Sequence, residues 1–191
     1  MSHIIDNLDA RLGARIRLER EARDWSLTDL AQRSGVSRAM INKVERGASS
    51  PTAALLGRLS GAFGLTLSTL LARSETVQGG RLVRAADRPR WEDPQTGYVR
   101  RQVAPSPASD LPLDLVDVDL PAGASITFPA SAYAFVRQII WVLEGRLSFT
   151  EGDVVHDLGT DDSLELGPPS PCTFGNATDR RCRYAVLVLR R

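Results

Sequence analysis

The stretch that most constrains this chain is residues 26–47, SLTDLAQRSGVSRAMINKVERG. Ser26 supplies a hydroxyl that can cap a helix over residues 27–34. Gly35 follows where a helix commonly ends in a left-handed residue. A second helix is predicted over residues 38–46. The pattern therefore predicts two short helices joined by a tight turn.

The second of these helices has a start signal, a stop signal and two faces. Ser37 can cap it and Gly47 ends it. The two helices share an apolar set spaced to face one core, namely Leu30, Ala31, Val36, Ile41 and Val44. The residues left over on the second helix are small, amide-bearing or cationic: Arg38, Ala39, Asn42, Lys43 and Arg46. A helix that lies in the major groove of DNA needs such a face.

Three more helices are predicted around this pair. Helical apolar spacing covers residues 4–23, and further helices are predicted over residues 52–63 and 65–71, the last with Ser68 as a candidate cap. Five helices in about 70 residues indicate a compact all-α domain.

Composition divides the chain into two unlike parts. Residues 1–75 hold 11 Lys and Arg against 8 Asp and Glu, whereas residues 76–191 hold 13 against 15. The difference suggests two roles, but it is too small to prove nucleic-acid binding. The chain has no apolar run long enough for a membrane span and no signal-peptide pattern at its start, so we expect a cytoplasmic protein that does not bind membranes.

The second part changes to a period of two. Strands are predicted over residues 81–85, 98–103, 113–120, 126–128, 136–143, 147–150, 154–158, 163–166 and 182–189. Residues 87–97 are predicted to be turn-rich, and close turns separate the later strands. Many short strands with close turns indicate a sandwich or a barrel.

The first part resembles the lambda-repressor-like helix-turn-helix domain of the Xre family of bacterial regulators. SLTDLA, GVS, ERG, the SPT loop and LSGAFGLTLSTLL carry the resemblance over residues 12–72. It implies a pseudo-palindromic double-stranded DNA operator and a homodimer. It also implies base or phosphate contacts by Ser37, Arg38, Ala39, Asn42, Lys43, Arg46, Ser49 and Ser50. An architectural Arg20–Glu45 pair is implied as well, while Leu27 stands where the family often has Gln.

The second part resembles the cupin family, a small jelly-roll barrel, through PAGASITF, VLEGRLSF and DDSLELGPPSPCTFGN followed by YAVLVL. The expected fold is therefore a five-helix lambda-repressor-like domain over residues 1–73, a linker over residues 74–80, and an all-β cupin jelly-roll barrel over residues 81–191.

The ligands of a cupin metal site are missing from the matching positions. Gln138 stands where the family has glutamate, Cys172 where it has histidine and Asn176 where it has asparagine, and His156 is the only histidine in this half. We therefore expect no metal or other cofactor. The barrel can still hold an organic ligand, and strand parity suggests Phe128, Tyr133, Gln138, Ile140, Cys172 and Phe174 as lining residues, although barrel core is the more common role for each.

Two other clusters have simpler explanations than function. Cys172 and Cys182 could form a redox pair beside an arginine cluster, but structural cysteines are more common. Asp114, Asp117 and Asp119 lie along one strand, where a solvated strand face is the simpler account.

The preferred hypothesis is a DNA-binding transcriptional regulator, not an enzyme, that a small-molecule effector in the barrel modulates. Two alternatives stay open. One is a cupin oxygenase or isomerase with a DNA-targeting domain, and the other is an antitoxin-like regulator whose barrel binds a protein.

Overall fold

The computed structural model describes residues 2–74, 82–104 and 111–190, with side chains from residue 8 onward. The linker predicted at residues 74–80 lies outside the described residues except for Ser74. The exact domain boundaries stay predictions.

Five helices form the first domain, as predicted. They are α1 (Ser2–Glu21), α2 (Leu27–Ser34), α3 (Arg38–Glu45), α4 (Ala53–Phe63) and α5 (Leu67–Ser74). The cap predicted at Ser68 for the last helix is wrong, because Thr66 Oγ1 accepts the bond from the Thr69 amide at 2.8 Å. Ser68 instead lies inside α5 and is buried.

Glycine lets α1 approach the end of α3. A Cβ atom on Gly13 would lie 2.2 Å from the carbonyl oxygen of Val44, so no larger residue fits there without a backbone shift. Leu12 and Ile16 flank this glycine and are fully buried with Ile41 of α3. The close crossing gives α3 a rigid support on its inner side.

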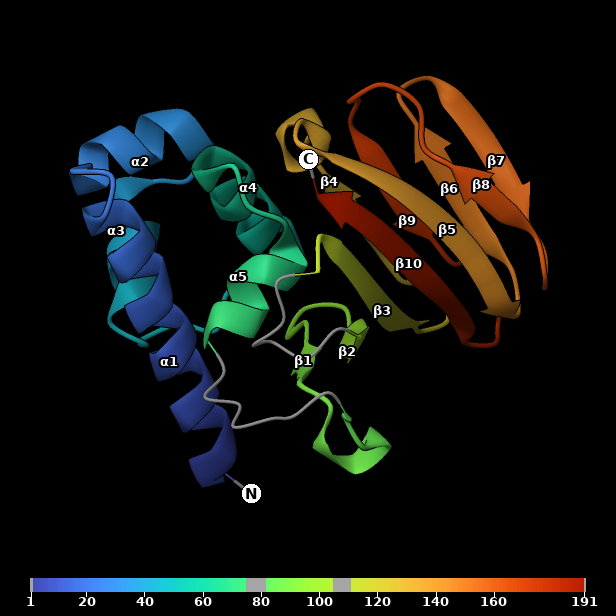
Figure 1. Ribbon diagram of the computed structural model, residues 1–191, viewed down its shortest axis with the longest axis horizontal. Coiled ribbons are helices and arrows are strands. Elements are labelled where there is room, and N and C mark those ends of the chain that lie inside the picture. The colour runs from blue at the N-terminus through green and yellow to red at the C-terminus, as the bar shows by residue number, and fades with distance from the viewer. Residues whose placement is uncertain (1, 75–81, 105–110, 191) are drawn as a thin grey trace.

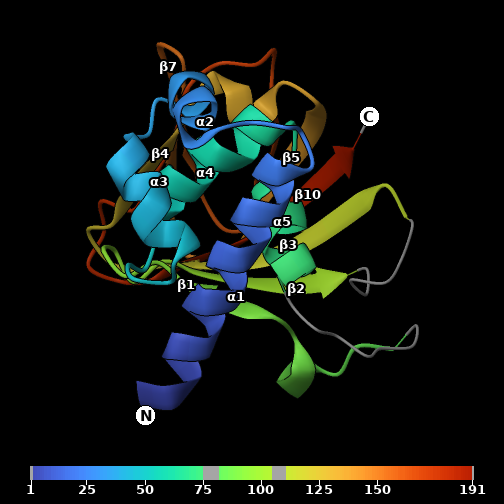
Figure 2. The ribbon, with the colours of Figure 1, turned by 90° about the vertical axis from the view of Figure 1, so that its left-hand side faces the viewer.

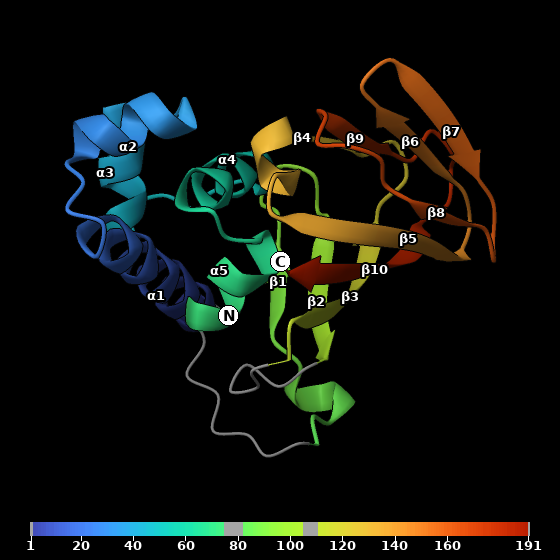
Figure 3. The same cartoon turned by 45° about the horizontal axis from the view of Figure 1, so that its top comes forward.

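Within residues 82–104 and 111–190, ten strands form two antiparallel sheets that pack face to face (Figures 1 and 3). One sheet has the order β1-β2-β3-β10-β5-β8 and the other β4-β9-β6-β7. Phe174 of β9 stacks on Tyr184 of β10 across the sandwich, with ring centroids 5.6 Å apart. The strand bounds are β1 Arg90–Glu92, β2 Val99–Ala104, β3 Leu113–Leu120, β4 Ser125–Phe128, β5 Val136–Glu144, β6 Leu147–Glu151, β7 Val154–Leu158, β8 Ser163–Glu165, β9 Cys172–Gly175 and β10 Cys182–Arg190.

Three strand predictions need correction. The strand predicted at 81–85 is absent over the described residues 82–85, and the short 3₁₀ helix η1 (Ala85–Asp87) begins there. β1 lies in the segment predicted to be turn, where the buried Trp91 holds it against the core. β9 was missed, although it pairs with both β4 and β6.

The aspartates of β3 do not form a solvated face. Asp117 is 6% exposed, and the Arg183 Nε donates to it at 2.8 Å. Asp119 accepts from Arg101 at 2.7 Å. Cross-strand ion pairs, rather than water, therefore hold these carboxylates on the outer side of the six-stranded sheet, and Asp119 Oδ1 is buried without a hydrogen bond from any described residue.

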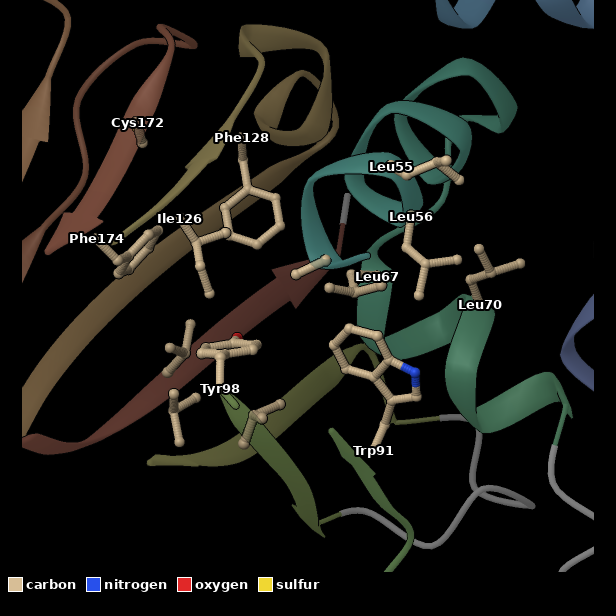
Figure 4. Packing of buried hydrophobic residues seen from close by; sticks show 14 of the residues in the cluster. Leu55, Leu56, Leu67, Leu70, Trp91, Tyr98, Ile126, Phe128, Cys172 and Phe174 are labelled. Atoms are coloured by element: carbon tan, nitrogen blue, oxygen red, sulfur yellow. The ribbon is translucent and has the colours of Figure 1, made fainter. Parts of the chain in front are cut away.

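The two domains share one apolar core. Leu55 and Leu56 of α4 lie with Trp91 and Phe128 of the sheets in the same buried cluster (Figure 4). Among the described residues no single helix is long and apolar enough to cross a membrane. α4 and α5 reach that length and composition only as a pair bent by 95°.

Candidate DNA-binding face and ligand cavity

The turn between α2 and α3 is built by local caps. Ser26 Oγ accepts from the Asp29 amide at 3.1 Å, and the Asp29 carboxylate accepts from the Ser26 amide at 2.8 Å, so both halves of a capping box are present. Gly35 adopts φ 66°, the left-handed conformation that ends α2. Ser37 then caps α3 through the Met40 amide at 3.3 Å. The predicted helix-turn-helix geometry is confirmed.

The polar face predicted for α3 is exposed. Ile41 and Val44 are buried on the inner side, whereas Ser37, Arg38, Ala39, Asn42, Lys43 and Arg46 are exposed. The side chains of Arg38, Lys43 and Arg46 make no hydrogen bond or ion pair with any described residue. α3 lies on the side of the molecule turned away from the sheets (Figures 1 and 2). Because these cationic side chains are exposed and unpaired among the described residues, they can bind an external anion.

A buried ion pair fixes the far end of α3. Arg20 of α1 holds Glu45 with two hydrogen bonds, Nε to Oε1 at 2.7 Å and Nη2 to Oε2 at 2.8 Å. The same guanidinium donates to the Trp25 carbonyl at 2.9 Å. The architectural role expected for Arg20 and Glu45 matches this geometry, because the pair locks α3 to α1 and to the corner before α2.

A second buried carboxylate ties α1 to α5. Glu19 is 4% exposed and accepts from Arg15, from Arg23 at 2.8 Å and from Arg73 at 2.7 Å. Burial opposes its ionisation, but the hydrogen bonds from these three arginines outweigh burial and lower the pKa of Glu19 to about 2. Sequence periodicity alone gave no signal for this cluster.

In the loop after α3 and at the start of α2, groups that could contact a phosphate already bond to other residues of the chain. Ser50 donates its hydroxyl to Asp9, so a phosphate at Ser50 would have to replace that carboxylate. Ser49 is half-buried. Leu27 packs against the core at the first turn of α2, and the neighbouring Asp29 carboxylate already occupies the helix end.

A cavity of about 440 Å³ opens between β5, the end of β6, and the loop that leads into β9. Of the six predicted lining residues, Tyr133, Gln138 and Cys172 line it. Phe128 and Phe174 line a much smaller space of about 40 Å³ beside it, which Tyr133 and Gln138 also border. Ile140 lines neither, because it points into the core and is fully buried.

Several lining residues were not predicted from the sequence. Glu151 lay in a predicted turn, yet its Oε1 accepts from the Gly167 amide at 2.8 Å at the wall of the cavity. Ser170 Oγ is buried without a hydrogen-bond partner among the described residues. Leu166, Pro168 and Pro169 complete an apolar wall together with Val136, which strand parity does place on the same face as Gln138. The cavity thus combines an apolar wall with a few polar groups, as ligand sites do.

The residues at the cupin metal positions do not fit a metal ion. The side-chain amide of Asn176 has a structural role, since its Nδ2 donates to the carbonyls of Leu120, Pro121 and Arg180. His156 stacks on Phe149, with centroids 6.3 Å apart. No group of three histidine, cysteine or carboxylate side chains with ligand geometry occurs within the described part of the chain.

Both cysteines are buried and free. Burial, then the charges of Asp119 and Glu144, raises the pKa of Cys182 to about 11. The arginine cluster does not counteract this, because Arg181 pairs with Glu144 and Arg183 with Asp117. Burial also raises the pKa of Cys172. Such thiols lack the low pKa of redox sensors.

Comparisons with known proteins agree with this geometry. A family model described as helix-turn-helix matches residues 16–70. The HTH-type transcriptional regulator SutR of Escherichia coli is 37% identical over 73 residues, which cover 38% of this chain and 41% of SutR. The chain therefore spans less than half the length of this curated relative.

The fold extends over both domains in a solved structure. An HTH_3 family transcriptional regulator from Vibrio cholerae aligns with 98% of this chain and 99% of its own, at a TM-score of 0.80 and 22% identity. The Cupin_2 domain of an XRE family transcriptional regulator from Enterobacter cloacae covers 49% of this chain and 97% of its own, at a TM-score of 0.45 and 19% identity. Residues 16–70 match the helix-turn-helix family model, and the chain as a whole has the fold of the Vibrio cholerae regulator, with five helices followed by two packed antiparallel sheets in the residues that the structure describes.

Proposed function

We propose that the protein is a sequence-specific, DNA-binding transcriptional regulator of the cytoplasm, with α3 as its recognition helix. The observation that carries the proposal is the exposed face of α3, where Arg38, Lys43 and Arg46 have no partner among the described residues. Arginine and asparagine on such a helix can bind base edges in pairs of hydrogen bonds, and lysine can neutralise phosphates.

The test starts from DNA selected by the purified protein from a random pool. Arg38→Ala and Lys43→Ala should each weaken binding to the selected operator by about 5- to 150-fold, the range for lost base or phosphate contacts. Arg180→Ala is the matched control, since Arg180 is exposed in the jelly roll and its side chain has no partner among the described residues. If both α3 variants bind like the wild type in fluorescence anisotropy, α3 is not the recognition helix.

The proposal includes a homodimer, because one recognition helix reads only one half-site of a pseudo-palindrome. The outer face of the six-stranded sheet suits a second copy of the chain. Ile139 and Trp141 of β5 are 40% and 44% exposed there, and Leu189 of β10 is 45% exposed. The charges on this face are paired within the chain, Arg137 with Glu165 and Arg183 with Asp117, so two identical faces can meet without like-charge repulsion.

Light scattering after size exclusion tests the dimer. Trp141→Arg should convert a dimer into a monomer and leave the circular dichroism spectrum unchanged. Val155→Arg, on the exposed strand β7 of the other sheet, should leave the measured mass at that of a dimer. A monomeric wild type at micromolar concentration, or a dimer that survives Trp141→Arg, contradicts this surface.

The cavity is proposed as the site of a small organic effector rather than a catalytic centre. Its apolar wall and the polar groups of Gln138, Glu151 and Ser170 favour a ligand with an apolar body and hydrogen-bonding groups. The enzyme alternative requires a metal that the donor set does not fit. Elemental analysis of purified protein decides between them, since a stoichiometric ion bound at the jelly roll would favour the enzyme.

A further inference from the structure

Helix α4 lies directly against the jelly roll, and two glycines set how close it comes. Helix α5 also reaches the sheet, where Arg100 of β2 donates to Ser68 Oγ at 2.6 Å. Gly57 and Gly61 are one helical turn apart on one face. A Cβ atom on Gly57 would lie 2.5 Å from Cδ1 of Phe128, and one on Gly61 would lie 3.0 Å from the backbone carbon of Ser131. The segment from Phe128 through the 3₁₀ helix η2 (Ala130–Tyr133) is therefore packed as tightly on α4 as glycine permits.

The other side of the same segment is a wall of the large cavity. Tyr133, Ala134 and Val136 line the cavity, and Tyr133 is 8% exposed. Burial, and then the charge and hydrogen bond of Cys172, raises the pKa of the Tyr133 phenol well above its usual value. Tyr133 also borders the small space that Gly57, Leu67 and Ser68 of the DNA-binding domain line. One layer of side chains thus separates the cavity from α4.

The far end of α4 is joined to the corner that leads into α2. Phe63 stacks on Trp25, with ring centroids 6.0 Å apart. Arg23 donates to the Phe63 carbonyl at 2.7 Å and lies over the Phe63 ring. Because packed cores transmit displacements rather than absorb them, a shift of α4 reaches the residues that position α2 and α3.

We propose that segment 128–136 transmits occupancy of the cavity to the helix-turn-helix through Gly57 and Gly61 of α4. The proposal rests on the proposed function and adds the route of regulation. A ligand that displaces Tyr133 and η2 changes the position of α4 against the jelly roll. The affinity for the operator then changes, because the ligand binds the displaced and the original arrangement of α4 with different affinity.

Cys172 allows the cavity to be filled without knowing the natural ligand. Its thiol lines the cavity, so methyl methanethiosulfonate would place a methylthio group there by forming a disulfide and releasing methanesulfinate. The experiment uses full-length protein with Cys182→Ala, which removes the second buried thiol. Labelling is driven to completion with excess reagent at alkaline pH, because burial raises the pKa of Cys172 and the thiolate is the reacting form. Complete labelling of Cys172, verified by mass spectrometry, should change operator affinity about fivefold or more after return to neutral pH, within the usual range of allosteric coupling, and dithiothreitol should reverse it.

The control places the same group on the jelly roll outside the cavity. Val155 is 64% exposed on β7, and Val155→Cys in a Cys172→Ser, Cys182→Ala background should label without changing operator affinity. Complete labelling of Cys172 with unchanged affinity overturns the proposed route. Failure of the unlabelled protein to bind any selected DNA would instead overturn the proposed function, so the two failures are distinguishable.

A glycine variant tests the contact itself. Gly61→Ala should alter the operator affinity of the unlabelled protein and reduce the effect of labelling to less than about twofold, because it forces η2 away from α4. Gly159→Ala is the matched control, since its Cβ would lie at an ordinary 3.5 Å from Asp162 in a distant turn. If labelling of Cys172 changes operator affinity as much in Gly61→Ala as in the parent protein, the contact at Gly61 does not transmit occupancy of the cavity.

Discussion

The cations of α3 and the arginines on the strands of the jelly roll differ in whether they are paired with carboxylates. On the strands, Arg101 pairs with Asp119, Arg137 with Glu165 and Arg183 with Asp117. On α3, Arg38 and Lys43 have no partner among the described residues. Arg137 and Glu165 form a pair although their side chains are 58% and 53% exposed, so burial alone does not explain the difference.

The difference shows what each set contributes. A paired arginine joins two strands and has little charge to offer a further anion. Neighbouring unpaired cations repel one another and add nothing to the fold, so their presence on one helix is explained by an external partner. The pairing of a charge is therefore a better guide to function here than net charge, which is only +1 for the chain. Four predictions test this contrast, ordered by their effect on the free energy of unfolding.

The largest effect is expected where a paired charge is buried. Glu45→Ala leaves Arg20, 12% exposed, without its carboxylate, and this should cost about 3–5 kcal/mol. Urea unfolding followed by tryptophan fluorescence, to which Trp25 beside this pair contributes, measures the loss. A cost below about 1 kcal/mol would mean that the pair does not hold α3 to α1.

Protonation of Glu19 at acid pH should lower the free energy of unfolding by an amount similar to that lost in Glu45→Ala. Its pKa falls from 4.5 to about 2 on folding, which corresponds to about 3 kcal/mol. Because the folded pKa is lowered, this stability is present above pH 4.5 and is lost as the pH falls from 4.5 toward 2. Glu19→Gln should flatten the pH dependence of unfolding in that window, and an equally steep dependence in the variant would contradict the assignment.

An exposed pair in the jelly roll should contribute much less. Arg146 and Asp157 are 2.9 Å apart, but their side chains are 62% and 64% exposed. Arg146→Ala should therefore change the free energy of unfolding by less than about 1 kcal/mol. Denaturant titration beside Glu45→Ala gives the direct comparison, and equal losses in the two variants would break the distinction between buried and exposed pairs.

The unpaired cations should have the smallest effect on folding. Arg46→Ala is expected to change unfolding by less than about 0.5 kcal/mol. In DNA binding, the same variant should weaken all sequences alike and reduce the slope of log affinity against log salt by about 0.9. A stable variant with an unchanged salt slope would remove Arg46 from the phosphate contacts.

The helix-turn-helix could be predicted because its signals are local. Ser26, Gly35 and Ser37 each act within three or four residues of the chain, and the structure places all three as expected. The exposed face of α3 follows from the same periodicity. Whether that face contacts DNA stays a prediction.

The jelly roll was less predictable because its determinants are distant in the sequence. β9 lies among prolines and glycines, and only its pairing with β4 and β6 makes it a strand. The start of α4 combines a local and a distant signal. Thr52 Oγ1 is the local cap and accepts from the Leu55 amide at 3.3 Å, whereas Asp93 Oδ1 accepts from the Ala53 amide at 3.0 Å across 40 residues of sequence. For the cavity, parity on β5 correctly predicted Gln138, but Glu151 and Ser170 could not be found without the fold.

The position of β10 has a consequence for how the protein is made. β10 lies between β3 and β5 and pairs with both along most of its length. The helices end at Ser74, so they can fold on the ribosome on the order of 10 s before residue 190 is synthesised, at ordinary elongation rates. Until then β3 and β5 both have an open edge, and a ribosome that stalls in this interval holds a finished helical domain beside unpaired strands. The newest part of the nascent chain closes the sheet, so this interval is when the protein most needs protection from aggregation.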